Sequence, residues 1–209
     1  MECTLCYSIE VNVFESVKNK NYFKCNNCDL VFLDPLHYLE FSKEKFRYDM
    51  HQNSLEDKGY VDFLNCVIEP TLEFIIDGDE GLDYGCGPNP VLAKLLDNLG
   101  YTCLFYDPIF FPKLEEREYD FIFATECFEH FYSPAKDLRK INKMLKSGGI
   151  LAIMTELNDD SKDFRNWYYI NDPTHVCFYS QKTISYICRE FEMEVLYSDN
   201  HRVVVFRKM

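Results

Sequence analysis

The sequence predicts an α/β protein in which a largely parallel sheet follows a small metal-binding module. Three observations lead to this prediction. Strand-like and helix-like segments alternate from about residue 80 to the end of the chain. A glycine-rich turn, Gly85-Cys86-Gly87, stands between the first of these strands and the first helix. Near the N-terminus, cysteines form two C-x2-C pairs, a spacing that is typical of zinc sites.

Length and composition are those of a folded globular protein. The chain has 209 residues, of which 47% are hydrophobic and 27% charged, which is enough for one domain of ordinary size with a small addition. With 22 Lys and Arg against 35 Asp and Glu, the formal net charge is −13. The negative electrostatic field of such a charge argues against loose binding to nucleic-acid phosphates or anionic membranes, although a local basic groove remains compatible with it.

Residues 1–35 contain the predicted zinc site. Cys3 and Cys6 form one pair, Cys25 and Cys28 form the other, and 18 residues separate the pairs. Four thiolates on two tight turns surround zinc tetrahedrally at about 2.3 Å, and so short a segment gains its folding energy from the metal. A redox pair is the competing interpretation, which two pairs at this spacing disfavour. We expect structural zinc, with a β-hairpin formed by residues 22–24 and 30–33.

The protein is expected to be cytoplasmic. Its N-terminus lacks a charged region followed by an apolar one, so no secretory signal is predicted. No stretch approaches the ~18–20 apolar residues of a membrane span. Thiols stay reduced in the cytoplasm, and free cysteines are mostly buried. We therefore assign the remaining cysteines to the core: Cys66, Cys86, Cys103, Cys127, Cys177 and Cys188.

Residues 36–79 are interpreted as a helical connecting segment that could act as a lid. The tetrapeptide at 54–57 has the pattern of a capping box, and apolar residues recur at helical spacing from there to residue 76. Pro70 is expected to kink or interrupt this helix. The loop before the helix either covers a ligand or is a solvated lead-in, and three of its residues are candidates for the first role: Tyr48, His51 and Asn53.

Residues 80–209 form the second module. We expect strands at 81–84, 101–106, 119–124, 150–154, 193–197 and 203–206, and helices at 91–96, 134–146 and 181–189. Strands that alternate with helices form a largely parallel sheet that is covered on both faces. In such sheets, ligands bind beyond the carboxyl ends of the strands.

The turn at Gly85-Cys86-Gly87 is typical of nucleotide binding. The glycines allow close approach of a ligand to the backbone, and Asp107, 24 residues after Asp83, is placed to bind ribose hydroxyls. The dinucleotide fingerprint has a third glycine, where this chain has Asn89 or Pro90. This difference disfavours NAD as the ligand.

These motifs resemble those of the class I S-adenosylmethionine (SAM)-dependent methyltransferases. Residues 82–87 match the family's first motif, and the similarity continues through residues 119–122, Glu129-His130 and residues 145–149. Together with the cysteine pairs, the whole chain looks like bacterial methyltransferases that carry an N-terminal zinc ribbon. The resemblance implies a Rossmann-like sheet, SAM as the cofactor, and a set of cofactor-binding residues: Asp83, Tyr84, Gly85, Cys86, Gly87, Asp107, Pro108, Thr125 and Glu126.

The chain departs from the family's pattern after Asp107. Only 12 residues separate Asp107 from Asp120, which is too few for a helix, a strand and their loops. One βα unit of the family's sheet is therefore expected to be missing. The adenine of the cofactor must then be held in another way, for which the candidates are Pro108, Ile109 and Phe110.

Four polar side chains are expected to meet at the ligand-binding edge of the sheet. Glu126, Glu129 and His130 follow the strand that ends at residue 124, and His175 lies in a loop after the next strand. Such a set could hold Mg²⁺, Mn²⁺ or Zn²⁺ with open positions for a substrate. The pattern is similar to the metal site of small-RNA 2′-O-methyltransferases and ubiquinone-pathway O-methyltransferases. Two other interpretations stay open: a histidine base without metal, and a Glu-His pair that caps a helix or contacts the cofactor.

The sequence therefore predicts a SAM-dependent methyltransferase. It would transfer the methyl group, in an SN2 step, to an oxygen or another nucleophile of a small-molecule acceptor. The predicted catalytic residues are Glu129, His130 and His175, which would deprotonate the acceptor through a histidine base or a bound metal. The negative charge favours a small acceptor over nucleic acid.

Two other functions are kept as alternatives. The first is methylation of tRNA or another macromolecule that docks on the zinc ribbon; it predicts a basic stripe there, of which Lys18, Lys20 and Lys24 are a hint. The second is a non-catalytic SAM-binding partner protein. Aromatic residues around His175 either close on an acceptor or belong to the core: Phe164, Trp167, Tyr168, Tyr169 and Phe178.

Overall fold

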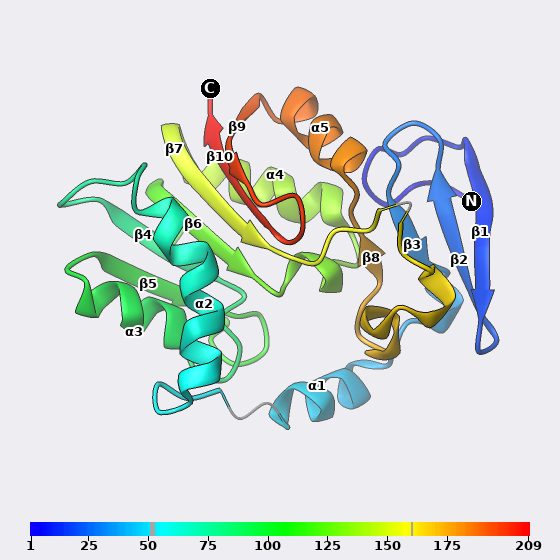
Figure 1. The fold of residues 1–209 in the computed structure, drawn as a ribbon, viewed down its shortest axis with the longest axis horizontal. Helices are drawn as coiled ribbons and strands as arrows, with labels where there is room; N and C mark the ends of the chain where they lie inside the picture. The colour runs from blue at the N-terminus through cyan, green and yellow to red at the C-terminus, as the bar shows by residue number, and fades with distance from the viewer. Residues whose placement is uncertain (51–52, 160) are drawn as a thin grey trace.

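Two sheets organise the computed structural model, which describes residues 1–50, 53–159 and 161–209. The larger sheet contains β4 (Glu80–Tyr84), β5 (Thr102–Tyr106), β6 (Tyr119–Thr125), β7 (Leu145–Met154), β9 (Met193–Ser198) and β10 (Val203–Lys208). Their order across the sheet is β5-β4-β6-β7-β10-β9 (Figure 1). The strands from β5 to β7 are parallel, and β10 is antiparallel to both of its neighbours. The prediction of a largely parallel sheet is confirmed.

Helices cover both faces of this sheet. α2 (Lys58–Thr71) and α3 (Val91–Asn98) lie on one face, where they bury Phe121 and Phe123 of β6. α4 (Pro134–Met144) and α5 (Gln181–Glu190) lie on the other, over Ile122 and Ala124 of the same strand. Successive residues of β6 thus enter different cores, as the two-residue period of a strand requires. β7 begins directly after α4, so the predicted extension of this helix to residue 146 is wrong.

The sheet ends at β5, as expected for a chain that lacks one βα unit. Residues 107–118 contain no helix, and their one pairing is an isolated bridge between Asp107 and Phe111. The segment folds back on β5, where the ring of Phe111 meets that of Phe105 at 4.9 Å between centroids. The prediction of a shortened sheet is confirmed.

The smaller sheet has the order β1-β2-β3-β8. β1 (Val11–Val17), β2 (Lys20–Cys25) and β3 (Val31–Leu33) come from the N-terminal segment, and β8 (Cys177–Phe178) comes from the far end of the chain. The predicted hairpin corresponds to β2 and β3. β1 was not predicted, although Lys18 and Asn19, both at positive φ, form the two-residue turn that joins it to β2 and are typical of a hairpin.

Residues 1–35, which carry the two cysteine pairs and are called the ribbon from here on, share one hydrophobic core with the larger sheet. β3 pairs with β8 through Val31–Phe178 and Phe32–Cys177. Tyr22 of β2 contacts Phe164 and Phe178, with ring centroids 5.1 and 5.8 Å away. Buried residues of the ribbon therefore continue the core that lies under α4 and α5.

The connecting segment contains a 3-10 turn, η1 (Pro35–His37), followed by α1 (Phe41–Asp49) and α2. α1 lies at the lower side of the molecule, beyond the ends of the central strands (Figure 1). The residue that caps α2 is Asp57, whose carboxylate accepts a hydrogen bond from the backbone N–H of Tyr60 at 3.1 Å. α2 ends at Thr71, one residue after Pro70. The predicted capping box at Ser54 is therefore wrong, whereas the end of the helix agrees with the interruption predicted at Pro70.

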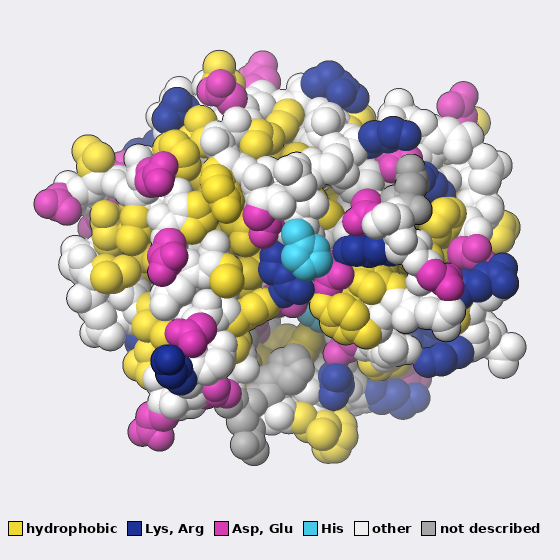
Figure 2. Space-filling view, in the orientation of Figure 1, with side chains coloured by type: hydrophobic (Ala, Val, Ile, Leu, Met, Phe, Trp, Pro, Cys, Tyr) yellow, Lys and Arg dark blue, Asp and Glu magenta, His cyan; other side chains and the backbone are white. Residues whose placement is uncertain are grey.

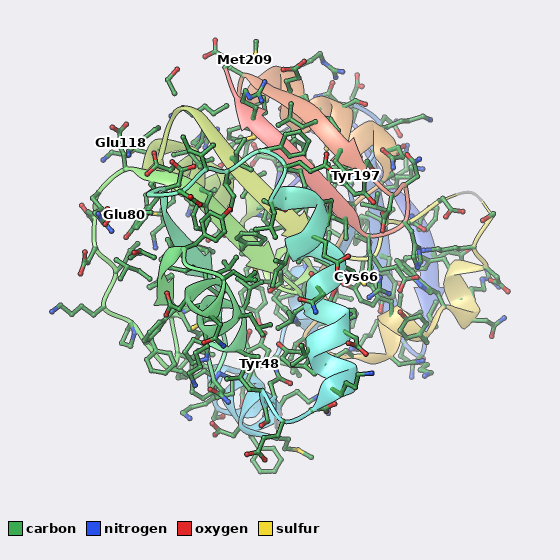
Figure 3. The ribbon with its side chains drawn as sticks, turned by 60° about the vertical axis from the view of Figure 1, so that its left-hand side comes forward. Tyr48, Cys66, Glu80, Glu118, Tyr197 and Met209 are labelled. Carbon is green, nitrogen blue, oxygen red and sulfur yellow. The ribbon has the colours of Figure 1, made fainter. Side chains whose placement is uncertain are left out.

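The isolated cysteines are mostly buried, as predicted, with one clear exception. Cys66 is exposed on the outer side of α2 (Figure 3), so its assignment to the core is wrong, and Cys188 is half-buried. Among the helices in the described ranges, none has the length and apolar character that a membrane crossing requires.

Candidate active site

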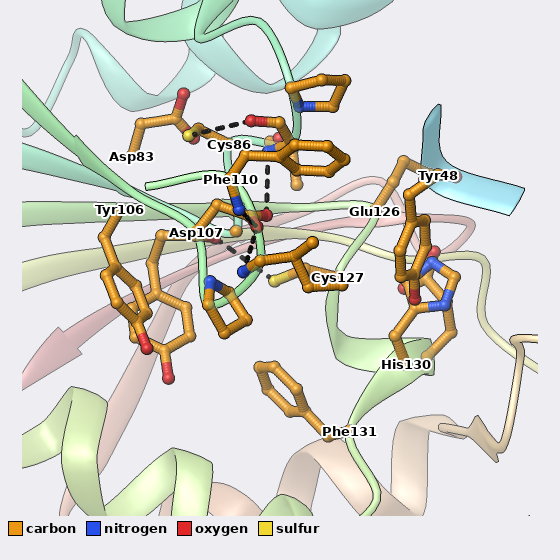
Figure 4. Close-up of a pocket in the computed structure, with 18 of the residues that line it drawn as sticks. Tyr48, Asp83, Cys86, Tyr106, Asp107, Phe110, Glu126, Cys127, His130 and Phe131 are labelled. Atoms are coloured by element: carbon orange, nitrogen blue, oxygen red, sulfur yellow. Dashed lines mark hydrogen bonds between the residues drawn. The ribbon is translucent and has the colours of Figure 1, made fainter. Parts of the chain in front are cut away.

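A cavity of about 950 Å³ opens at the carboxyl ends of β4, β5 and β6. Its walls are the segments that follow these strands, together with residues of α1 and α2 (Figure 4). This is the position at which sheets of this kind bind ligands. Every residue predicted to bind a cofactor lines the cavity: Asp83, Tyr84, Gly85, Cys86, Gly87, Asp107, Pro108, Thr125 and Glu126.

Two glycines of the turn after β4 adopt positive φ, for different reasons. Gly85 (φ 83°) passes so close to the next segment that a Cβ atom there would lie 2.7 Å from Cβ of Cys127. Gly87 (φ 66°) borders open space, since no described atom beyond its two chain neighbours lies within 4 Å of the place of its missing Cβ. The first glycine allows the turn to pack, and the second leaves room for a ligand beside the backbone.

Asp107 holds the two turns of the cavity together. One carboxylate oxygen accepts the backbone N–H of Gly87 at 3.1 Å, and the other accepts those of Ile109 and Phe110 at 2.8 and 3.0 Å (Figure 4). A carboxylate has about four acceptor positions, so Asp107 retains capacity for a ligand hydroxyl. The predicted ribose-binding residue thus also shapes the site.

Asp83 is a buried carboxyl at the floor of the cavity. Only 1% of its surface is exposed, and its Oδ1 atom has no hydrogen-bond partner in the described part of the chain. Burial raises the pKa of Asp83 to about 7, with a further contribution from Asp107, although the backbone N–H of Ala93 acts in the opposite direction. A ligand that donates a hydrogen bond or carries positive charge would satisfy this oxygen.

Glu126 occupies a strained turn directly after β6. Its φ is 47°, a value that is uncommon for a residue with a side chain. Burial, followed by the charge of Glu129, raises the pKa of Glu126 to about 9. Its Oε1 atom also lacks a partner among the described residues.

Large aromatic side chains line the cofactor end of the cavity, and of Tyr84, Tyr106 and Phe131 only Tyr84 was predicted from the sequence. Tyr106 and Tyr84 pack with centroids 5.2 Å apart, and Phe131 meets Tyr84 edge-on at 6.3 Å. The Lys140 ammonium lies 4.5 Å from the Tyr106 ring centroid and donates to the tyrosine hydroxyl at 3.2 Å. Tyr106 ends β5, so its position at the site was readable from the strand pattern. The predicted adenine neighbours Pro108, Ile109 and Phe110 line the same cavity.

Glu129, His130 and His175 form a compact group at the other end. One possible ligand atom of each residue lies within 4.8 Å of the others. Glu129 is fully buried; its Oε1 accepts from the Tyr169 hydroxyl at 2.6 Å, whereas its Oε2 has no partner among the described atoms. Glu126 was predicted as a fourth ligand, but it does not belong to this group.

Both imidazoles are held in the same tautomer by carbonyl groups. Nδ1 of His130 lies 3.0 Å from the carbonyl oxygen of Thr174, and Nδ1 of His175 lies 2.7 Å from that of Tyr169. A carbonyl only accepts, so each Nδ1 carries a proton, and in the neutral imidazole each Nε2 keeps its lone pair. Burial, the largest of several influences, lowers the pKa of His175 and favours this neutral form. Two neutral nitrogens and one carboxylate oxygen can bind a divalent cation, or a histidine can accept a proton.

The connecting segment covers the histidine end of the cavity. Tyr48 of α1 meets the ring of His130 edge-on at 5.4 Å (Figure 4). Arg47 ties α1 to the loop of His175 through an ion pair with Asp172 at 2.9 Å. The backbone carbonyl of Asn53 accepts a hydrogen bond from Asn89 at 2.8 Å. The geometry thus favours a covering segment, while His51, its third predicted residue, lies outside the described residues.

The four N-terminal cysteines form a second group of possible metal ligands. Their sulfur atoms lie within 4.8 Å of one another, with 3.5 Å between those of Cys3 and Cys28 and 3.4 Å between those of Cys6 and Cys25. None is in a disulfide. Zinc–sulfur bonds of about 2.3 Å in a tetrahedron place sulfur atoms about 3.8 Å apart. The observed spacing fits such a site with small adjustments.

A family profile described as a methyltransferase domain matches residues 27–198. No curated protein matches the sequence. Among solved structures, the 1,6-didemethyltoxoflavin-N1-methyltransferase of Burkholderia thailandensis, with bound 1,6-didemethyltoxoflavin and S-adenosylhomocysteine, is similar at a TM-score of 0.59 and 12% identity. That comparison covers 95% of this chain and 99% of the other.

Two further structures have the same fold. Magnesium protoporphyrin IX methyltransferase from Synechocystis PCC 6803, with bound S-adenosylhomocysteine, has a TM-score of 0.53 at 13% identity, over 81% of this chain and 94% of its own. A chain from the complex between the Haloferax volcanii Trm112 methyltransferase activator and a methyltransferase has the same score and identity, over 73% and 93%. These similarities confirm the predicted Rossmann-like α/β fold.

The buried carboxyl of Asp83 leads to a test by pH. Between its ordinary value of 3.8 and the folded value of about 7, the folded protein holds a proton that the unfolded chain has lost, so this residue makes stability fall as pH rises. Replacement of Asp83 by Asn, which does not titrate, removes this decrease in stability with rising pH. The free energy of unfolding of Asp83→Asn, relative to wild type, should rise by about 1.4 kcal/mol per pH unit between pH 5 and 7 and then level off.

Urea unfolding followed by circular dichroism at several pH values measures this difference. Asp62→Asn is the matched control, because Asp62 makes the same change of charge on the exposed side of α2. Its difference from wild type should not follow this curve. A pH-independent difference for Asp83→Asn would contradict the prediction.

Proposed function

The chain belongs to the methyltransferase domain family, and on that premise we propose that it transfers a methyl group from SAM to an oxygen, or another nucleophile, of a small-molecule acceptor. The observation that carries the proposal is the arrangement of the cavity. A glycine-rich turn with an unsatisfied carboxyl lies at one end, and the group formed by Glu129, His130 and His175 lies at the other.

The residues after β4 and β5 fit the cofactor. The unpartnered oxygen of Asp83 suits a cationic or hydrogen-donating group, and Gly87 leaves open space beside the backbone. Asp107 has acceptor capacity for ribose hydroxyls. Bound SAM would supply the activated methyl group. The presence of S-adenosylhomocysteine in two similar structures supports this choice of cofactor.

The group at the histidine end fits a divalent cation. Histidines that bind metals commonly donate their second N–H to a carbonyl or carboxylate, as both His130 and His175 do. The unpartnered Oε2 of Glu129 is the third available ligand atom. A cation such as Mg²⁺, Mn²⁺ or Zn²⁺ would lower the pKa of an acceptor hydroxyl. In its absence, Nε2 of either histidine can accept the acceptor's proton.

Charge favours a small acceptor over a nucleic acid. The acidic residues Glu44, Glu126 and Asp172 line the cavity near the histidines. On the face shown in Figure 2, the Lys and Arg side chains lie mostly over the ribbon side and are interspersed with Asp and Glu. Lys24 pairs with Asp29 at 3.0 Å, and Lys18 bonds to Asn171 at 2.8 Å. These contacts do not favour the basic stripe that a docked RNA requires.

A structural zinc in the ribbon and a cytoplasmic setting complete the proposal. The spacing of the four thiols supports zinc. A purely non-catalytic role is less well supported, because such a protein needs no tautomer-matched histidine pair beside its cofactor.

Cofactor binding can be tested by isothermal titration with SAM and S-adenosylhomocysteine. Wild type should bind both. Gly87→Ala should bind them at least about 10-fold more weakly, because the methyl group enters the open space beside the turn. Gly100→Ala is the control, since Gly100 also has a positive φ (95°) and open surroundings but does not line the cavity. Equal affinities for the two variants would contradict the assignment.

Methyl transfer can be followed with methyl-tritiated SAM added to a small-molecule fraction and, separately, to an RNA fraction of a cell extract. We expect label in the small-molecule fraction. His175→Ala should lower the rate about 100-fold or more without changing SAM affinity, whereas His201→Ala, on the exposed surface, should have no effect. Labelling of RNA alone would favour the macromolecular alternative.

Loss of the ribbon's metal should destabilise the entire chain. Cys28→Ser removes one thiolate of the site, whose zinc is expected to contribute ~10 kcal/mol to folding. Because the ribbon and the larger sheet share a core, the variant should lose zinc and unfold at lower temperature in a single transition. Elemental analysis and circular dichroism measure the two effects. Cys66→Ser, outside the cluster, should retain both properties, and unfolding of the ribbon alone would count against a shared core.

A further inference from the structure

We propose that Tyr169 is the positioning residue of the group formed by Glu129, His130 and His175. The inference rests on the proposed binding of a divalent cation by this group. Tyr169 lies in η4 (Tyr168–Asn171), a 3-10 turn that sequence reasoning connected to the core or to an acceptor. Its hydroxyl donates to Oε1 of Glu129 at 2.6 Å, and its backbone carbonyl accepts from Nδ1 of His175 at 2.7 Å. One residue therefore orients two of the three possible ligands.

The hydroxyl of Tyr169 can donate in only one direction. It accepts the backbone N–H of Glu156 at 3.2 Å, and the hydroxyl of Thr155 lies 3.3 Å away. A hydroxyl has one proton and two lone pairs. With both lone pairs facing Thr155 and Glu156, the proton is left for the carboxylate of Glu129, at the shortest of the three distances.

This hydrogen bond gives the two oxygens of the Glu129 carboxylate different roles. Oε1 is occupied by Tyr169, while Oε2 is buried and unpartnered within the described residues. The ring of Tyr169 also packs on His175, with centroids 4.2 Å apart. The tyrosine thus fixes the rotation of the carboxylate and the plane of the imidazole together. Contacts of this kind around metal ligands commonly contribute 10- to 100-fold to metal affinity, as an order of magnitude.

The turn that carries Tyr169 is held by a buried carboxylate. Glu156, with 3% of its surface exposed, accepts from Trp167 Nε1 at 2.9 Å and from the hydroxyl of Tyr168. Lys162 and Arg202 also donate to it, at 2.8 and 3.3 Å. The two residues that precede Tyr169 in the sequence are therefore anchored to one carboxylate. The residues of this network do not line the cavity, but they fix the turn that carries the positioning tyrosine.

Titration of the zinc-loaded protein with Mn²⁺, followed by electron paramagnetic resonance, tests the proposal. Tyr169→Phe should bind Mn²⁺ about 10- to 100-fold more weakly than wild type, because Glu129 loses its orienting partner. SAM affinity, measured by titration calorimetry, should not change. Tyr119→Phe is the control, since Tyr119 is 1% exposed and donates to the carbonyl of Glu115 at 3.0 Å, away from the cavity. It should lose stability in the same way and retain Mn²⁺ affinity.

The possible outcomes separate this inference from the proposed function. Equal Mn²⁺ affinities for wild type and Tyr169→Phe would overturn the positioning role while leaving the metal site intact. Equal losses in Tyr169→Phe and Tyr119→Phe would also overturn it, because they would indicate a general effect of stability. Failure of wild type to bind Mn²⁺, with SAM binding retained, would overturn the metal site and the inference together. Failure to bind SAM would contradict the proposed function itself.

Discussion

The site depends on two backbone hydrogen bonds made by Val176. Its N–H donates to the carbonyl of Glu129 at 2.8 Å, and its carbonyl accepts the N–H of Leu33 at 2.9 Å. Val176 is fully buried, and water therefore does not compete for these bonds. Since His175 precedes it and β8 follows it, this residue joins the ribbon, the segment after β6 and the histidine loop. The ribbon is thus part of the wall that brings Glu129 and His175 together.

Because the sheet is shortened, side chains enclose parts of the cavity that regular structure would otherwise enclose. Without a further βα unit beyond β5, the cofactor end of the cavity is enclosed by Tyr106, Phe131 and the turn that Asp107 closes. At the opposite end, α1 supplies the cover, and its ion pair with Asp172 ties that cover to the loop of His175. A few large or charged groups therefore replace regular structure on two sides of the cavity.

Local patterns were sufficient for the sheet and for much of the site. Parallel strands end at one edge, and this rule, together with the glycine-rich motif, placed Asp83, Asp107 and His175 at the cavity. Contacts between distant segments could not be predicted: Tyr169 meets Glu129 across 40 positions of sequence, and no pattern marks such a pair. The positive φ of Glu126 could not be predicted either, because nothing in its residue type indicates it. Glu126 is also the predicted ligand that does not join Glu129 and the two histidines.

The pairing of β3 with β8 has a consequence for how the chain folds during its synthesis. Val31 leaves the ribosome long before Phe178, its partner in the sheet. At translation rates of about 5–20 residues per second, the edge of β3 that pairs with β8 stays unpaired for on the order of 10 s or more. The four clustered cysteines, up to Cys28, are all synthesised before this interval begins. A metal bound early would hold the ribbon as a preformed template, onto which the histidine loop docks when synthesis is nearly complete.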